Sequence, residues 1–193
     1  MIRSQLEHAI RASCDVLKID EVTILGSQSI LGKWNERQLP PKAIFSKEVD
    51  VADFTKATLI DQEKSADLLE GLLGEYSRFH QTHGFYIDGV DSSTASLPPG
   101  WNKRLVKVQN RNTNNKIGWC LEPHDLCVAK LAANREKDRE FVTAVMKADI
   151  VKPKIIRQRL EQVPENKFMT GKYGKSASLA YADSLIESAK RRW

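Results

Sequence analysis

The chain has 193 residues, of which 41% are hydrophobic, enough for the core of one domain or of one domain with a small helical appendage. The sequence contains no run of 18 apolar residues, which excludes a membrane-spanning helix, and its N-terminus lacks the apolar stretch of a signal peptide. The formal net charge of +5 is uneven, because residues 1–60 are neutral, residues 61–100 carry −5 and residues 101–193 carry +10.

The charge distribution and the cysteines bear on where the chain works. A basic C-terminal half raises the local concentration of anions, so it suits nucleic acid or a polyanionic small molecule, or else it is a solvated helical surface. Cys14, Cys120 and Cys127 are odd in number and lack the spacing of metal ligands. We therefore expect buried, reduced thiols in a cytoplasmic protein.

The N-terminal part predicts a helix, a strand and a tight turn. Apolar residues spaced four, four and three apart indicate an amphipathic helix over residues 2–18. A buried strand is expected at Glu21–Leu25, followed by a turn at Gly26 and Ser27 and a short helix beginning near Gln28. Turns of this kind can bind phosphate, but the sequence matches neither of the two best-known glycine-rich nucleotide motifs.

The next stretch predicts a loop, two strands and an intervening helix. Two adjacent prolines mark residues 33–47 as a loop, and the alternation from Glu48 to Phe54 predicts a strand with one buried face. A helix is expected over residues 62–82 and another strand from Phe85 to Val90. The apolar stripe of that helix is predicted to comprise Leu68, Leu69, Leu72 and Leu73.

The remainder predicts a loop, a hairpin and then helices. Residues 92–101 read as a loop and residues 104–121 as a hairpin with an asparagine-rich tip. Amphipathic helices are expected within residues 122–135, 136–149, 152–163 and 175–193. The predicted fold class is therefore α+β, with an α/β core over residues 1–121 and a helical region over residues 122–193 that packs on it.

Two carboxylates on the predicted strand are the first candidates for chemistry. Glu48 and Asp50 are two positions apart and share one face, whereas Val49 and Val51 face the opposite way, toward a core. Neighbouring carboxylates repel one another unless a cation lies between them, and Mg²⁺ is a natural partner. The alternative is that both are simply the solvated face of a half-exposed strand.

Together these two segments resemble the nucleotidyltransferase superfamily that includes DNA polymerase β. The resemblance lies in a strand ending in hydrophobic-Gly-Ser, a short helix, and a strand bearing two carboxylates. It implies that Gly26 and Ser27 hold the triphosphate of an NTP. It also implies that Glu48 and Asp50 hold the metal ions, Mg²⁺ or Mn²⁺, that activate the attacking hydroxyl. Two features depart from the family pattern: the connection over residues 28–47 is longer, and the first carboxylate is Glu instead of Asp.

A third carboxylate often serves such enzymes as the base for the acceptor hydroxyl. Asp88 in the strand from Phe85 to Val90 is the best-placed candidate, and Asp91 is the next. The alternative for Asp88 is a turn residue preceding Gly89.

Residues 121–142 resemble the helix pair of the AbiEii-like branch of the superfamily. The matching positions are Asp125, Leu126, Lys130, Leu131, Arg135, Lys137 and Asp138. Lys130, Arg135 and Lys137 are candidates to bind the nucleotide phosphates. Lys130 and Asp138 are also candidate catalytic residues, with Asp138 orienting the cations or adding an acidic group. Lys130 and Lys137 share a face if the helix is continuous. The alternative is a surface cluster of paired charges.

The resemblance implies transfer of a nucleoside monophosphate from an NTP to a hydroxyl of RNA, such as a tRNA end, or of a protein. Many members of this branch are toxins, so an antitoxin protein is an implied partner, and a membrane is not. The rival interpretation is a non-catalytic nucleotide- or nucleic-acid-binding protein that retains the fold.

Overall fold

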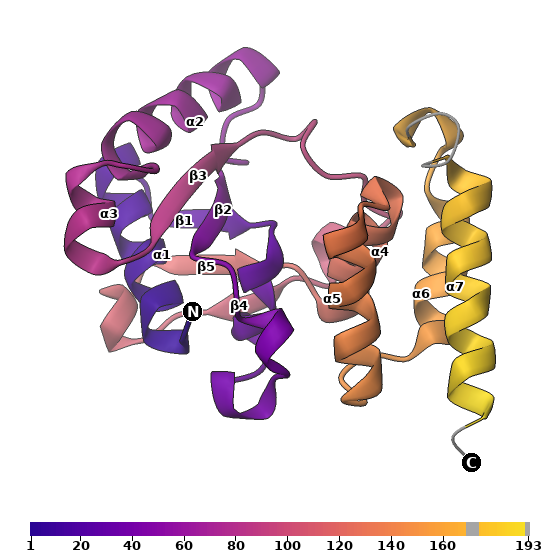
Figure 1. The fold of residues 1–193 in the computed structure, drawn as a ribbon. Helices are drawn as coiled ribbons and strands as arrows, with labels where there is room; N and C mark the ends of the chain where they lie inside the picture. The colour runs from indigo at the N-terminus through magenta and orange to yellow at the C-terminus, as the bar shows by residue number, and fades with distance from the viewer. Residues whose placement is uncertain (169–173, 192–193) are drawn as a thin grey trace. The chain divides into compact units, whose positions relative to one another are not determined.

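The computed structural model describes residues 1–168 and 174–191 (Figure 1). The chain divides into two compact units, one formed by Met1–Thr94 and Leu105–Glu122, the other by Ala95–Arg104 and Pro123–Trp193. The first unit contains a mixed sheet with helices, and the second is helical, so the predicted α+β class is confirmed. Among the described residues, no helix has the length and apolar character needed to cross a bilayer.

The first unit is built on a five-stranded sheet in the order β3-β2-β1-β5-β4. Its strands are β1 (Glu21–Ile24), β2 (Glu48–Ala52), β3 (Tyr86–Val90), β4 (Val106–Val108) and β5 (Ile117–Cys120). β1 pairs antiparallel with β2 and parallel with β5, which places it at the centre of the sheet. β2 pairs parallel with β3, whereas β4 and β5 form the predicted antiparallel hairpin.

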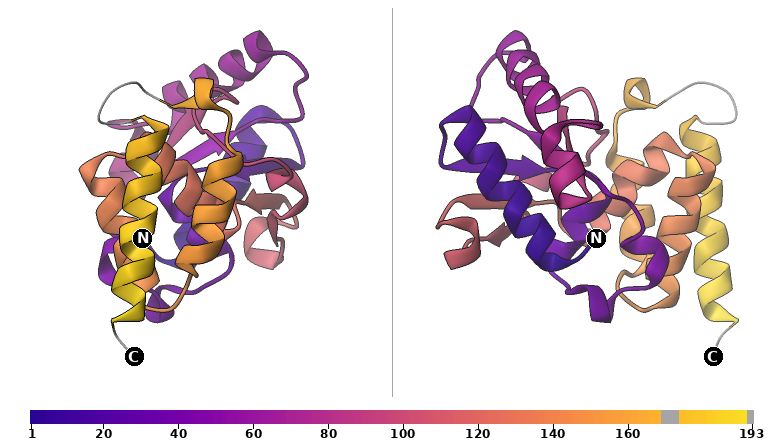
Figure 2. Two further views of the ribbon diagram at one scale, coloured as in Figure 1. Left: turned by 90° about the vertical axis from the view of Figure 1, so that its right-hand side faces the viewer. Right: turned by 60° about the vertical axis from the view of Figure 1, so that its left-hand side comes forward.

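Helices α1 (Arg3–Leu17), α2 (Leu59–Leu73) and α3 (Arg78–His83) belong to the same unit, and α1 and α2 lie next to one another (Figure 2). The close packing of α2 on β3 requires a glycine, since a Cβ added at Gly89 would lie 2.1 Å from the Ala66 carbonyl oxygen. Gly89 therefore faces the helices. Because side chains alternate along a strand, Asp88 faces the other way.

The predicted helix over residues 62–82 is two helices, because the chain turns between Leu73 and Arg78. Tyr76 adopts a left-handed conformation (φ 66°), and the Ser77 hydroxyl accepts a hydrogen bond from the His80 backbone N–H (3.1 Å), which starts α3. A serine cap of this kind begins a new helix and does not continue an old one.

The predicted apolar stripe of α2 is only half right. Leu69 and Leu73 are buried, but the side chains of Leu68 and Leu72 are 45% and 54% exposed. The face that packs on the sheet also contains small and polar residues, namely Gln62, Ser65 and Ala66. Runs of adjacent leucines therefore do not mark the buried face of this helix.

The second unit consists of α4 (Pro123–Ala133), α5 (Glu136–Lys147), α6 (Pro153–Gln162) and α7 (Lys175–Lys190), so the four predicted helices are confirmed. The predicted end of the last one, residues 192 and 193, lies outside the described residues. α4 packs on α5 and α6, and α6 packs on α7. The fully buried side chains of this unit include Leu126, Leu131, Val142, Ile156 and Leu160.

Helices α4 and α5 are separate, as predicted, so the condition under which Lys130 and Lys137 would share a face, one continuous helix, is not met. Asn134 adopts a left-handed conformation (φ 52°), and Arg135 is extended at the start of α5. Asparagine tolerates this conformation better than most residues, so it can end α4 and redirect the chain. Lys130 lies on α4 and Lys137 on α5.

Candidate active site

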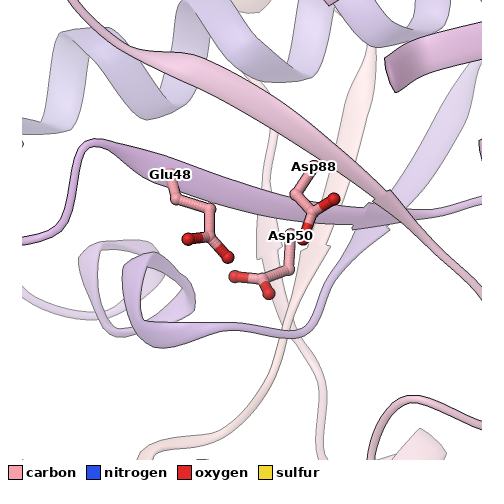
Figure 3. A group of neighbouring side chains, drawn as sticks. All are labelled: Glu48, Asp50 and Asp88. Atoms are coloured by element: carbon pink, nitrogen blue, oxygen red, sulfur yellow. The ribbon is translucent and has the colours of Figure 1, made fainter. Parts of the chain in front are cut away.

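Three carboxylates gather on the sheet face opposite the helices (Figure 3). Glu48 and Asp50 project from β2, while Val49 and Val51 between and beside them are fully buried. Parallel pairing of β2 with β3 sets Asp88 directly beside Asp50. One carboxylate oxygen from each of Glu48, Asp50 and Asp88 lies within 4.8 Å of the others. The structure thus brings together the predicted pair and the best-placed third carboxylate.

Electrostatic repulsion among the three carboxylates shifts the pKa of Asp88. Burial and the nearby carboxylates of Asp50 and Glu48 raise the pKa of Asp88 to about 7. A hydrogen bond with the Glu70 carboxyl of α2 acts in the same direction. A group that would normally ionise well below neutral pH therefore retains a proton up to neutrality when no cation is bound.

Tyr86 supports the first carboxylate from the neighbouring strand. Its hydroxyl donates a hydrogen bond to Glu48 Oε2 (3.3 Å), and burial together with the Glu48 charge raises the pKa of Tyr86 to about 12. The phenol therefore stays protonated and can hold one oxygen of Glu48 in place. Glu48 and Tyr86 are register partners, and Tyr86 lies two positions before Asp88 on the same strand face.

The turn after β1 lies directly against the cluster. A Cβ added at Gly26 would lie 1.5 Å from Asp50 Oδ2, so only glycine fits beside this carboxylate. The Gly26 backbone is extended (φ −81°, ψ −166°), which shows that close approach, not an unusual conformation, requires the glycine. Ser27 follows at the first position of a 3₁₀-helix, Ser27–Gly32, and the Leu25 N–H donates to the Asp50 carbonyl oxygen (3.0 Å).

The long connection between the two motifs does not separate them. It folds into short 3₁₀ turns, and its apolar side chains Ile30, Leu31, Leu39 and Ala43 are buried. The Gln28 side chain donates to the Ser46 carbonyl oxygen (3.3 Å), which links the start of the connection to its end. The extra residues therefore form a compact, packed segment that leads the chain back to β2.

Two of the predicted phosphate-binding residues of the second unit, Lys130 and Arg135, form ion pairs with Asp138. Asp138 is fully buried, with Oδ1 3.2 Å from Lys130 Nζ and Oδ2 2.6 Å from Arg135 Nε. The Lys130 ammonium also lies 4.6 Å from the centre of the Phe141 ring. Lys137 is exposed. The alternative of a surface charge cluster fits the exposed residues Arg135, Glu136 and Lys137. It does not fit Asp138, which is buried, or Lys130, which is nearly so.

Three further residues define the extent of the cluster, because Asp91 lies outside it and Glu70 and Tyr86 contact it. Asp91, the second candidate for the third carboxylate, accepts a hydrogen bond from the Ser93 backbone N–H (2.6 Å) and caps a turn. Glu70 and Tyr86 were not predicted, although both contact the cluster. Strand alternation could have indicated Tyr86, whereas a glutamate on a helix carries no such signal.

The donor set fits a hard divalent cation. Carboxylate oxygens are the ligands that Mg²⁺ and Mn²⁺ prefer, and both ions keep positions open for substrate phosphates. The raised pKa of Asp88 shows that the cluster would gain from a positive charge at this position. Glu48, Asp50 and Asp88 are thus suited to hold such an ion.

A family model described as a nucleotidyltransferase of unknown function (DUF6036) matches residues 4–173 of the chain. The match includes the turn at Gly26, the three carboxylates and the ion cluster around Asp138. Searches of curated proteins and of solved structures gave no match.

Proposed function

Since the chain belongs to the family of nucleotidyltransferases of unknown function, we propose that it transfers a nucleoside monophosphate from an NTP to a hydroxyl group, with Mg²⁺ or Mn²⁺ as cofactor. The observation that carries the proposal is the three-carboxylate cluster, whose member Asp50 packs against the Gly26 turn. A phosphate-binding turn and a metal site must adjoin one another for this reaction, and these two segments do.

Each residue of the cluster has a role in the proposal. Glu48 and Asp50 hold the ion, which when bound neutralises charge on the triphosphate and on the leaving pyrophosphate. The backbone at Gly26 and the hydroxyl of Ser27 bind phosphate oxygens. Asp88 takes the proton of the attacking hydroxyl, since its carboxylate adjoins those that hold the ion, and the bound cation lowers its pKa and keeps it ionised to accept that proton. Tyr86 fixes the orientation of Glu48.

The acceptor is proposed to be RNA, with a protein hydroxyl as the other candidate. The excess of positive charge in residues 101–193 supports RNA, because basic surfaces attract the phosphate backbone. A role as the toxin of a toxin–antitoxin pair, in the AbiEii-like branch, rests on the sequence resemblance of residues 121–142 alone.

Nucleotide binding by Lys130, Arg135 and Lys137 is a further part of the proposal and rests on the same resemblance. Lys130 and Arg135 also neutralise the buried Asp138, so replacing them would disturb the helical unit. Lys137 is the informative position because it is exposed. We expect Lys137→Ala to weaken NTP binding in fluorescence titrations and to leave the thermal unfolding midpoint unchanged; unchanged affinity removes Lys137 from the site.

Label transfer tests the reaction. The protein is incubated with Mg²⁺ and each α-³²P-labelled NTP, first with total RNA and then with cell lysate, and the labelled products are separated by denaturing gels. We expect transfer by the wild type and by Asp91→Ala, and loss of transfer in Asp50→Ala. Asp91 is the matched control because its carboxylate caps a turn outside the cluster.

One observation favours the non-catalytic alternative. Glu48 is longer than the usual aspartate, and one of its oxygens already accepts a hydrogen bond from Tyr86. Nucleotide binding without label transfer to any acceptor, in wild type and Asp50→Ala alike, would establish that alternative.

A further inference from the structure

Exposed apolar side chains concentrate on α2 and the turn that follows it. Seven large apolar side chains are exposed among the described residues, and five of them lie between residues 59 and 76. These five are Leu59 (45%), Ile60 (64%), Leu68 (45%), Leu72 (54%) and Tyr76 (79%). Single exposed apolar residues need no explanation, but a gathering on one helix marks an interaction surface.

The geometry of α2 aligns several of these residues. Leu68 and Leu72 are four positions apart, so their side chains are neighbours on the helix surface. Gly71 lies beside them, and a Cβ added there would meet no atom within 4 Å. A glycine in an exposed helix interior costs about 1 kcal/mol relative to alanine, so the absence of a side chain here has a cost in stability. We call Ile60, Leu68, Gly71 and Leu72 the α2 outer face.

The charges around the α2 outer face are mostly negative. Glu63, Asp67 and Glu75 are exposed on the same segment. The one lysine of the helix, Lys64, lies 3.1 Å from Asp61 and is neutralised by it. Residues 59–76 contain five acidic side chains against this one lysine, a net charge of −4.

This charge selects among the candidate occupants. A second α2 from another copy would bring like charges together, and both nucleic acid and anionic membranes would be repelled. A basic partner with apolar side chains gains from both features of the surface. An amphipathic helix supplies them together, since it can place an apolar stripe on the leucines and cations on either side.

We propose that the α2 outer face binds an amphipathic helix of a partner protein, with lysine or arginine flanking its apolar stripe. The carboxylates project from the sheet face away from α2, although the Glu70 carboxyl of α2 reaches Asp88 on the edge strand β3. The exposed charges around the surface indicate a complex whose affinity falls as the salt concentration rises.

A display library of helical peptides with unbiased charge, selected against the immobilised full chain, tests the proposal. We expect enriched sequences to carry Lys or Arg beside an apolar stripe. Their affinity, measured by fluorescence anisotropy, is expected to fall about tenfold or more in the double variant Leu68→Gln/Leu72→Gln. Phe45→Gln is the matched control, because Phe45 is 88% exposed and lies outside α2.

Several outcomes would overturn the proposal. Enrichment of acidic or neutral peptides would do so, as would a failure to enrich any sequence or equal binding to the double variant. A dimer in sedimentation velocity that the double variant abolishes would assign the surface to a second copy. Binding to phosphatidylserine vesicles that the double variant abolishes would assign it to a membrane. Thermal unfolding of the double variant checks that it folds. We expect it to fold, because both leucines are exposed.

Discussion

At the residue scale, the tightest constraint in the sheet unit lies between Gly26 and Asp50. The Gly26 Cα leaves no room for a methyl group, because Asp50 Oδ2 occupies that position. The glycine that the sequence associates with phosphate thus also sets how closely a carboxylate of the proposed metal site approaches the turn. Gly26 differs in this respect from Gly71, where an added Cβ would meet no atom within 4 Å.

Replacing Gly26 tests this contact. We expect Gly26→Ala to displace the Asp50 carboxylate and weaken Mn²⁺ binding by about tenfold or more, since ligand misplacement of this size commonly costs that much. Isothermal titration calorimetry with Mn²⁺ measures the effect. Gly71→Ala is the control: it should leave Mn²⁺ binding intact and stabilise the fold by about 0.5–1 kcal/mol. Unchanged Mn²⁺ affinity in Gly26→Ala would mean that Asp50 does not bind the ion.

The raised pKa of Asp88 makes the free energy of unfolding of the metal-free protein depend on pH. Its pKa is about 7 in the folded chain and 3.8 as an ordinary aspartate. The folded state therefore holds a proton that the unfolded state has released, and metal-free stability falls as the pH rises from about 4 to about 7. Below that window both states hold the proton, and the penalty is absent.

Asp88→Asn removes this penalty. In EDTA at pH 8 we expect the variant to unfold about 2–4 °C above the wild type, corresponding to on the order of 1 kcal/mol after solvent screening of a half-exposed group. At pH 3.5 the two proteins should unfold together. Mg²⁺ should raise the midpoint of the wild type more than that of the variant. A variant less stable than the wild type at pH 8 would contradict the repulsion argument.

At the element scale, α3 is held to α1 by an aromatic cluster around His8. The His8 ring lies 5.2 Å from Phe79, 5.8 Å from Phe85 and 4.3 Å from His83, centre to centre. Burial lowers the pKa of His8 to about 4, and the charges of Arg11 and His83 act in the same direction. The neutral imidazole therefore belongs to the packed state of this short helix.

The sign of the pH effect follows from the lowered pKa. The unfolded chain takes up a proton at His8 near pH 6.5, but the folded chain does so only near pH 4. Stability contributed by His8 is complete above pH 6.5 and is lost as the pH falls toward 4. NMR titration of the His8 ring should give a pKa near 4, and Phe79→Ala should move it toward 6.5 by removing burial. A wild-type value near 6.5 would rule out the packed imidazole.

Across the whole molecule, local periodicity predicted most of the elements, and long-range pairing explains what it missed. Alternation on β2 was enough to place Glu48 and Asp50 on one face. The neighbouring position of Asp88 depends on the register of β2 with β3, which joins residues 38 positions apart and has no local signature. The break at Asn134 depends on one left-handed residue. Periodicity predicted a helix on either side of it but not the direction of one helix relative to the other, so it left open whether Lys130 and Lys137 share a face.

The sequence also did not show which charged side chains are buried, and Asp125 is an example. Asp125 is one of the positions in residues 121–142 that resemble the AbiEii-like branch. In the structure it lies at the centre of an ion cluster. Its fully buried carboxylate accepts hydrogen bonds from Arg104 Nε (2.7 Å) and from Arg159 Nη1 (3.0 Å). Arg104 also donates to the Pro99 carbonyl oxygen (3.2 Å). The cluster thus ties residues 95–104, distant in sequence, into the helical unit.

Arg104→Ala tests whether this cluster stabilises the helical unit. The change leaves a fully buried carboxylate with one partner, so we expect a loss of about 2–3 kcal/mol, somewhat below the usual cost of breaking a buried pair because Arg159 remains. Urea unfolding followed by circular dichroism measures it, since the unit is helical. Lys190→Ala is the control, because its pair with Glu187 is well exposed on both sides and should contribute under about 0.5 kcal/mol. Equal, small losses in the two variants would show that the Asp125 carboxylate is hydrated in solution and that another contact holds residues 95–104.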